Sequence, residues 1–482
     1  MADPVKKKLI EVSLPLEKIN AEASREKSIR HGHPSTLHLY WARRPLAAAR
    51  AVLFAQLVDD PSAHPEKFPT IEEQDAERDR LHKLIEELVV WENSNDERLL
   101  EQACKEIRDS NGGELPAVLD PFAGGGTIPL EAQRLGLEAH ASDLNPLAVL
   151  INKALIEIPP RFKDMPPVFP GAAETRIEWK GTEGLAEDVR RYGEWMRDEA
   201  EKRIGHLYPK VKEPGGTEHT VIAWIWARTV RNPNPANPIE VPLVRSWWLS
   251  KRKGREAWVE AKVIDGEVHY EVRHDANGPT GESEGTVNRR GAVSIADGTP
   301  IDFKYIREEG KAGRIGSHLI AIVGTDTRGR LYITPNELHR RTAWVSRPRG
   351  YPDAPLPPAA PGFRVQAYGF ELWADLFTNR QLNALTTFSD LVAEAGKKCL
   401  AEINAYDPNG GSEYVSAVMT FLSFAVSRAT NKSSSLCSWD SSNKMQAVRG
   451  VFARQALPMV WDYAESNPLA DSSGSFSKAV SY

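Results

Sequence analysis

The sequence of 482 residues predicts an α/β fold interrupted by a β-rich insertion. Residues 115–135 form an apolar run, a glycine run and a helically spaced apolar stretch, the pattern of a strand, a tight turn and a helix. Hairpin signals are concentrated further along the chain, between two proline-rich stretches. At roughly 150 residues per domain, the length allows two or three domains.

The composition is that of a globular protein, with 41% hydrophobic and 26% charged residues. The 61 basic and 66 acidic residues give a net charge of −5, so nucleic-acid binding requires a local basic patch. Cys104, Cys399 and Cys437 are too scattered for a disulfide framework, which favours a reducing compartment. Glu11 and Glu17 interrupt any signal-peptide core. We therefore expect a cytoplasmic protein.

Two proline-rich stretches divide the chain, at residues 159–171 (PPRFKDMPPVFPG) and 350–362 (GYPDAPLPPAAPG). Proline fixes φ and lacks an N–H donor, so such stretches act as stiff connectors. They predict three segments, 1–170, 171–350 and 351–482.

The middle segment begins with a charged helix over residues 184–207 and continues with hairpins over 258–274 and 318–334. The first hairpin turns at Asp265-Gly266, a strong two-residue turn signal. The third segment is predicted to be helical. It has a buried helix over residues 414–426 and another over 443–465 that bends at Pro458.

The glycine run predicts a cofactor site. The first strand ends at Asp120, and glycines at 124–126 permit positive φ and close approach of a ligand to the backbone. The following helix begins with unpaired N–H groups that suit a carboxylate or phosphate. A second strand, residues 137–142, leads to Asp143, which is placed to accept hydrogen bonds from ribose hydroxyls.

Other interpretations of this stretch differ in strength. A dinucleotide fingerprint fails because Pro129 occupies the position that needs a small residue, and the chain has no standard P-loop. A purely structural interpretation remains, in which Asp143 begins an Asx turn before a helix at Pro146. Strand-end acids at both Asp120 and Asp143 favour the cofactor site.

The sequence DPFAGGGT at residues 120–127 resembles the S-adenosyl-L-methionine motif of DNA amino-methyltransferases. Together with residues 28–45 (SIRHGHPSTLHLYWARRP) and 452–462 (FARQALPMVWD), it makes the chain resemble bacterial adenine-specific DNA methylases with an inserted zinc-ribbon-like region. That family is often associated with phage defence. The resemblance implies a Rossmann-like S-adenosylmethionine-dependent methyltransferase domain that methylates adenine N6 in double-stranded DNA, in restriction-modification or phage defence.

The resemblance also implies roles for the three segments. Residues 1–170 would contain the cofactor-binding half, 171–350 a degenerate zinc-ribbon-like insertion, and 351–482 a helical continuation of the methyltransferase domain. Residues 33–45 would help to close the pocket, with an arginine near the cofactor carboxylate; alternatively, Arg43 and Arg44 cap or pair locally. The implied cofactor-binding residues are Asp120, Pro121, Phe122, Ala123, Gly124, Gly125, Gly126, Thr127, Asp143 and Asn145.

Enzymes of this class hold the target base with an Asp/Asn/Ser-Pro-Pro-Tyr/Phe motif, and this motif is absent from the sequence. We therefore assign no catalytic residue. We expect the chain to be the N-terminal portion of a longer or split methylase, with a separate chain carrying the motif and other defence-system proteins as possible partners. Two alternatives stay open: a catalytically silent DNA-binding or scaffold subunit, and a methylase of cytosine N4.

The insertion lacks the cysteines of a zinc ribbon. Asn232 and Asn237 stand where the resemblance places cysteines, and amides are poor zinc ligands, so we predict no metal. Basic residues and aromatics alternate at 245–255 and 339–349, which favours DNA contact, although solvated faces over core tryptophans would produce the same pattern. The predicted DNA-binding residues are Trp248, Lys251, Arg252, Lys253, Arg340 and Arg341.

Overall fold

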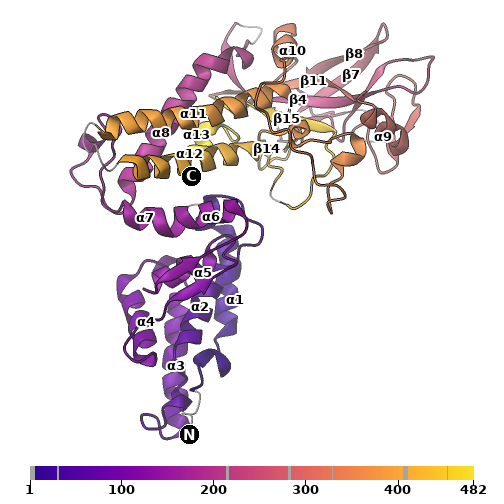
Figure 1. Ribbon diagram of the computed structural model, residues 1–482. Coiled ribbons are helices and arrows are strands. Elements are labelled where there is room, and N and C mark those ends of the chain that lie inside the picture. The colour runs from indigo at the N-terminus through magenta and orange to yellow at the C-terminus, as the bar shows by residue number, and fades with distance from the viewer. Residues whose placement is uncertain are drawn as a thin grey trace. The chain divides into compact units, whose positions relative to one another are not determined.

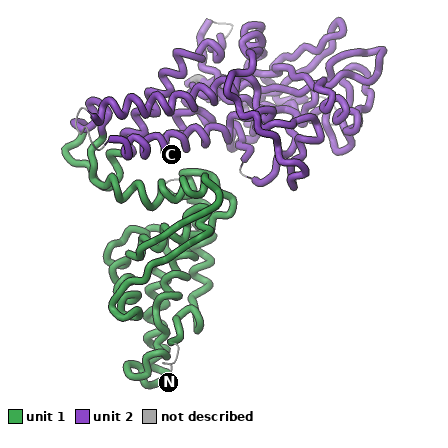
Figure 2. The backbone as a smooth tube through the Cα atoms, viewed as in Figure 1, with its two compact units in different colours: residues 1–167, 176–185, 482 green, residues 168–175, 186–481 purple. Residues whose placement is uncertain are grey.

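A computed structural model describes residues 6–29, 32–212, 216–279, 284–327, 329–404, 411–452 and 454–481. The chain is a mixed α/β protein with several small sheets (Figure 1). It divides into two compact units (Figure 2). Unit 1 contains residues 1–167 and 176–185, and unit 2 contains residues 168–175 and 186–481. None of the helices in the described ranges combines the length and apolar character needed to cross a membrane.

Unit 1 is mainly helical. Its elements are α1 (Leu16–Arg25), α2 (Leu46–Leu57), α3 (Ile71–Leu88), α4 (Glu97–Ser110), β1 (Val118–Asp120), α5 (Thr127–Arg134), β2 (Ala139–Ala141), α6 (Pro146–Asn152), a π-helix (Lys153–Glu157) and α7 (Ile158–Arg161). Helix α2, rich in alanine and leucine, contacts α1, α3, α4 and α5. Because it meets other helices on several sides, apolar residues occur around most of its circumference.

A buried ion pair joins α2 to α5. Arg50 Nε lies 2.5 Å from Glu131 Oε2, and both side chains are almost completely buried. Arg50 also donates to the Leu88 carbonyl and to Ser94 Oγ, while Arg134 donates to the other Glu131 oxygen. These contacts fix the orientation of α5 and therefore the position of the glycine loop that precedes it.

Unit 2 is built on antiparallel strands. It includes most of α8 (Glu183–Ile204) and then β3 (Val211–Lys212), β4 (Glu218–Arg231), β5 (Glu240–Leu243), β6 (Trp248–Ser250), β7 (Ala257–Ile264), β8 (Glu267–Arg273), β9 (Gly291–Val293), β10 (Pro300–Asp302), α9 (Phe303–Lys311), β11 (Gly316–Asp326), β12 (Gly329–Ile333) and α10 (Glu337–Ala343). It continues with α11 (Asn379–Asn404), α12 (Gly411–Thr430), β13 (Ser438–Trp439), β14 (Val448–Arg449), β15 (Asp462–Ser466) and α13 (Phe476–Val480).

Several local predictions are confirmed. The hairpins are β7–β8 and β11–β12, and Asp265 and Gly266 both have positive φ, 52° and 80°, as a two-residue turn of this kind requires. The helices predicted at 184–207 and 414–426 correspond to α8 and α12.

The helix predicted over residues 443–465 is wrong. This stretch contains β14 and most of β15, and β15 pairs antiparallel with β4 in the order β12-β11-β4-β15. Pairing of Tyr463 with Trp226 and of Ala464 with Ile225 buries this strand in the sheet, which overrides the helical pattern. Residues 351–482 therefore contribute a strand to the sheet of the middle segment, in addition to helices α11 and α12.

The parallel sheet is also smaller than expected. Among the described strands, β1 and β2 are the only parallel pair, and each has three residues. After α6 the chain continues through the π-helix, α7 and α8 before it reaches the antiparallel strands of unit 2. The described residues form one βαβ unit, less than the extended parallel sheet of a complete Rossmann-like domain.

A buried ion pair ties β15 to α11. Arg380 donates through Nε and Nη2 to the two Glu465 oxygens, at 3.0 and 2.8 Å. Trp226 and Thr378 also donate to this carboxylate. Both charged side chains are 1% exposed or less, so each depends on the other to compensate its lost hydration.

We predict that Arg380→Met destabilises the protein by about 3–5 kcal/mol, because it leaves the Glu465 carboxylate buried without its cation. Urea unfolding would measure the loss. The control is Arg203→Met, which breaks the ion pair between Arg203 and Glu394 of α11. Both side chains of this pair are about 40% exposed. Its loss should cost less than about 1 kcal/mol. Equal effects of the two variants would contradict the prediction.

Candidate functional site

The βαβ unit brings the predicted acids to one edge. Val118 pairs with Ala139 and Asp120 with Ala141, so the two parallel strands end side by side. Asp120 is the last residue of β1, and Asp143 follows two residues after β2. This confirms that the acids lie at the carboxyl ends of adjacent strands, where nucleotide ligands bind in open α/β sheets.

The glycine loop needs glycine at two positions for its backbone. Gly124 has φ +49°, and Gly126, the N-cap of α5, has φ +77°. A Cβ on Gly126 would lie 3.0 Å from Asn152 Oδ1. Asn152 is buried on α6, and its Nδ2 donates to the Gly124 carbonyl at 3.2 Å. The loop is therefore held close to α6 by a hydrogen bond that a larger residue at Gly126 would disturb.

Asp143 connects the glycine loop to the end of β2. Its Oδ2 accepts from the Gly124 N–H and its Oδ1 from the Asn145 N–H, both at 2.8 Å. These backbone hydrogen bonds, first from Asn145 and then from Gly124, lower the pKa of Asp143. The Asx turn of the structural interpretation is present at Oδ1. A carboxylate has about four acceptor positions, so capacity for a ligand hydroxyl remains.

The other predicted residues mainly shape the loop. Asp120 Oδ1 accepts from the Phe122 N–H at 3.1 Å, and Asn145 caps α6 by accepting from the Leu147 N–H at 3.0 Å. Pro121 is exposed, whereas Ala123 and Gly125 are buried. Phe122 and Leu144 are 87% and 100% exposed at this end of the strands. They provide apolar surface beside the two acids.

The N-terminal segment lies against the glycine loop. A Cβ on Gly124 would come within 3.1 Å of the Tyr40 ring, and one on Gly125 within 3.2 Å of Arg43 Nε. Thr127 Oγ1 donates to the Arg44 carbonyl at 3.0 Å. These contacts agree with the expected location of residues 33–45 beside the glycine loop.

Arg43 is electrostatically unusual. Its three guanidinium nitrogens are buried and have no hydrogen-bond partner among the described residues. Burial lowers its pKa to about 10, so the group remains charged at neutral pH. The resemblance implied an arginine near the cofactor carboxylate without distinguishing Arg43 from Arg44. In the structure Arg44 is exposed.

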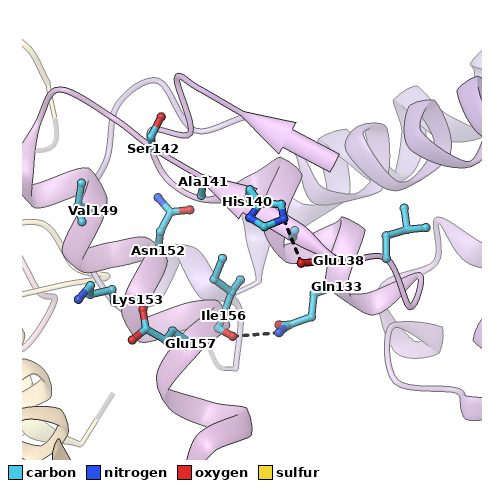
Figure 3. A pocket seen from close by; sticks show the side chains of 12 residues that line it. Gln133, Glu138, His140, Ala141, Ser142, Val149, Asn152, Lys153, Ile156 and Glu157 are labelled. Atoms are coloured by element: carbon cyan, nitrogen blue, oxygen red, sulfur yellow. Dashed lines mark hydrogen bonds and ion pairs between the residues drawn. The ribbon is translucent and has the colours of Figure 1, made fainter. Parts of the chain in front are cut away.

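A cavity of about 520 Å³ lies along β2 on the side facing α6 and the π-helix (Figure 3). Its lining combines apolar residues with ionisable ones, including the His140–Glu138 pair at 3.1 Å. The lining residues are Gln133, Leu137, Glu138, Ala139, His140, Ala141, Ser142, Val149, Asn152, Lys153, Ile156 and Glu157. Asn152 belongs to this lining and also contacts the glycine loop, so the cavity adjoins the candidate site.

The predicted DNA-binding residues lie in unit 2. Trp248 is half-buried on β6, with Lys251 Nζ 5.7 Å from its ring. Lys251 pairs with Glu284 at 2.7 Å, and Arg252 and Lys253 are exposed in the β6–β7 loop. Arg340 and Arg341 lie on α10, where Arg340 is 3.8 Å from Glu337. No described hydrogen bond or ion pair joins the two clusters.

The asparagines of the insertion converge on a carboxylate. The Nδ2 atoms of Asn232, Asn234 and Asn237 lie 3.3, 2.8 and 3.0 Å from Asp297 Oδ2. Desolvation acts to raise the pKa of Asp297, but hydrogen bonds from Thr299 and Ser294 outweigh it and lower the pKa. The described residues contain no group of three or more His, Cys, Asp or Glu side chains that could hold a metal ion.

Residues 13–84 match a family described as "Protein of unknown function (DUF1156)". The matched region includes Tyr40, Arg43 and Arg50 and ends before the glycine loop. No curated protein and no solved structure matches the chain.

We predict that Gly126→Ala destabilises unit 1 more than Gly112→Ala does. Both positions have positive φ, +77° and +71°, which costs a non-glycine residue about 1–2 kcal/mol. Only the Gly126 variant also meets Asn152, because nothing lies within 4 Å of a Cβ on Gly112. Thermal unfolding of both variants measures the difference, and an equal shift would show that the Asn152 contact is unimportant.

Proposed function

We propose that unit 1 binds S-adenosyl-L-methionine and that the chain is the cofactor-binding part of a DNA adenine-N6 methyltransferase. The observation that carries the proposal is the glycine loop between two parallel strands, hydrogen-bonded through Gly124 to the strand-end carboxylate Asp143. The DPFAGGGT motif that forms this loop resembles the corresponding motif of DNA amino-methyltransferases.

The residues at the carboxyl ends of β1 and β2 suit the ribose, methionine and adenine parts of S-adenosyl-L-methionine. The ionised Asp143 has acceptor positions for ribose hydroxyls, and the glycine run permits close approach of a ligand to the loop backbone. Leu144, fully exposed next to Asp143, offers an apolar surface to the adenine ring. Phe122 adds exposed aromatic surface at the end of the neighbouring strand.

Binding of the target base needs residues that hold it, and this sequence contains no known motif for that purpose. Methyl transfer to an exocyclic amine needs a flipped base whose nitrogen faces the methyl group. Since no Asp-Pro-Pro-Tyr-type motif is present, we propose that a further polypeptide segment or a separate chain supplies this function. The 482-residue chain is then expected to bind cofactor without methylating DNA.

We predict that the 482-residue chain binds one equivalent of S-adenosyl-L-methionine in isothermal titration calorimetry and that Asp143→Ala weakens binding at least tenfold. Removing the carboxylate eliminates the ribose acceptor and the hydrogen bond that shapes Gly124. Asp109→Ala, at an exposed residue of α4, is the control and should bind normally. Failure of the unmodified chain to bind the cofactor would refute the proposed function.

The DNA partner can be tested through unit 2. We predict that the double variant Arg252→Glu/Lys253→Glu weakens binding to double-stranded DNA and flattens the dependence of affinity on salt, because fewer counterions are released. The control Lys304→Glu/Lys311→Glu makes the same charge change on α9. If both double variants behave alike in fluorescence anisotropy, the β6–β7 loop is not the contact. DNA binding without cofactor binding would favour the silent-subunit alternative.

A further inference from the structure

The guanidinium of Arg43 lacks the compensation that buried charges normally have. Its nitrogens are removed from water and donate no hydrogen bond to any of the described residues. Burying an unpaired charge is costly, and buried charges in folded proteins are normally paired. The other deeply buried arginines all have acceptors within the protein. Arg50 pairs with Glu131 and Arg380 with Glu465. Arg228 donates to the carbonyl groups of Val460 and Ser435. Arg43 is therefore arranged for an anion that binds from outside.

The location of Arg43 defines where that anion binds. The guanidinium lies against Gly125, in the loop that leads into the N-terminus of α5. The unpaired N–H groups and the dipole of a helix N-terminus also favour an anion. A planar guanidinium suits a carboxylate because it can donate two parallel hydrogen bonds.

The segment around Arg43 is held firmly enough to serve as a receptor. Glu26 accepts from the Leu46 and Ala47 N–H groups at the start of α2, at 2.9 and 2.7 Å. Thr127 binds the Arg44 carbonyl, and Arg50 anchors α2 to α5. A site fixed in this way loses little conformational entropy when a ligand binds.

We propose that Arg43 binds the α-carboxylate of S-adenosyl-L-methionine and selects ligands that carry this group. The inference rests on the proposed function and deepens it. It assigns the amino-acid end of the cofactor to a residue within the matched region of unknown function, residues 13–84. The βαβ unit holds the nucleoside end through Asp143, and the N-terminal segment supplies the charge for the other end.

The test compares Arg43→Met with Arg44→Met in the full 482-residue chain. Calorimetry uses S-adenosylmethionine, S-adenosylhomocysteine and decarboxylated S-adenosylmethionine, which keeps the ammonium group and lacks the carboxylate. We expect Arg43→Met to weaken the two carboxylate ligands at least tenfold and to leave the affinity for the decarboxylated ligand within about twofold. Arg44→Met should match the unmodified protein with all three. A third variant, Arg43→Lys, keeps the charge without the fork and should give an intermediate loss.

Thermal unfolding without ligand provides an independent measurement. Replacing an unpaired buried cation with methionine should raise the melting temperature, since the desolvation cost is removed. A lower melting temperature for Arg43→Met would overturn the inference, because it would mean that the guanidinium is stabilised within the protein. An equal loss of affinity for all three ligands would also overturn it. If the unmodified chain binds none of the ligands while Arg43→Met melts higher, the proposed cofactor is wrong and the anion receptor stands.

Discussion

The buried Arg50–Glu131 pair is the interaction on which the candidate site depends. It crosses from α2 to α5, the two elements that follow the Arg43 segment and the glycine loop. Apolar residues of the same two helices, among them Ala51, Phe54 and Ala132, pack in one core cluster. Arg50 also binds the Leu88 carbonyl, which extends the same network to α3. This network of charged groups in the core of unit 1 thereby helps to fix the glycine loop and Arg43 relative to each other.

Local sequence signals predicted turns and strand ends better than they predicted the pairing of distant strands. These signals are the glycine run, the acids at Asp120 and Asp143, and the Asp265-Gly266 turn. Each depends on the backbone conformation of a few consecutive residues, so it can be recognised in the sequence alone. The pairing of β15 with β4 joins residues more than 200 positions apart in the chain. Nothing in residues 443–465 reveals that partner, and their apolar spacing suited a helix equally well.

The sequence also could not show which of Arg43 and Arg44 lies against the glycine loop. Adjacent arginines look alike in the sequence, and only the anchoring of α2 decides which one turns toward Gly125. The structure shows one buried and one exposed guanidinium. For Asp143 the sequence offered a ribose contact or an Asx turn. The structure shows the Asx turn and adds a hydrogen bond from the Gly124 N–H that shapes the glycine loop.

The convergence of Asn232, Asn234 and Asn237 on Asp297 has a consequence for the life of the protein in a cell. This cluster is held together by hydrogen bonds between side-chain amides and a carboxylate, so it contains no thiol that peroxide could oxidise. Its formation also does not have to wait for a trace element to be delivered during synthesis. The hydrogen bonds of this cluster are therefore the same under oxidative stress as in its absence.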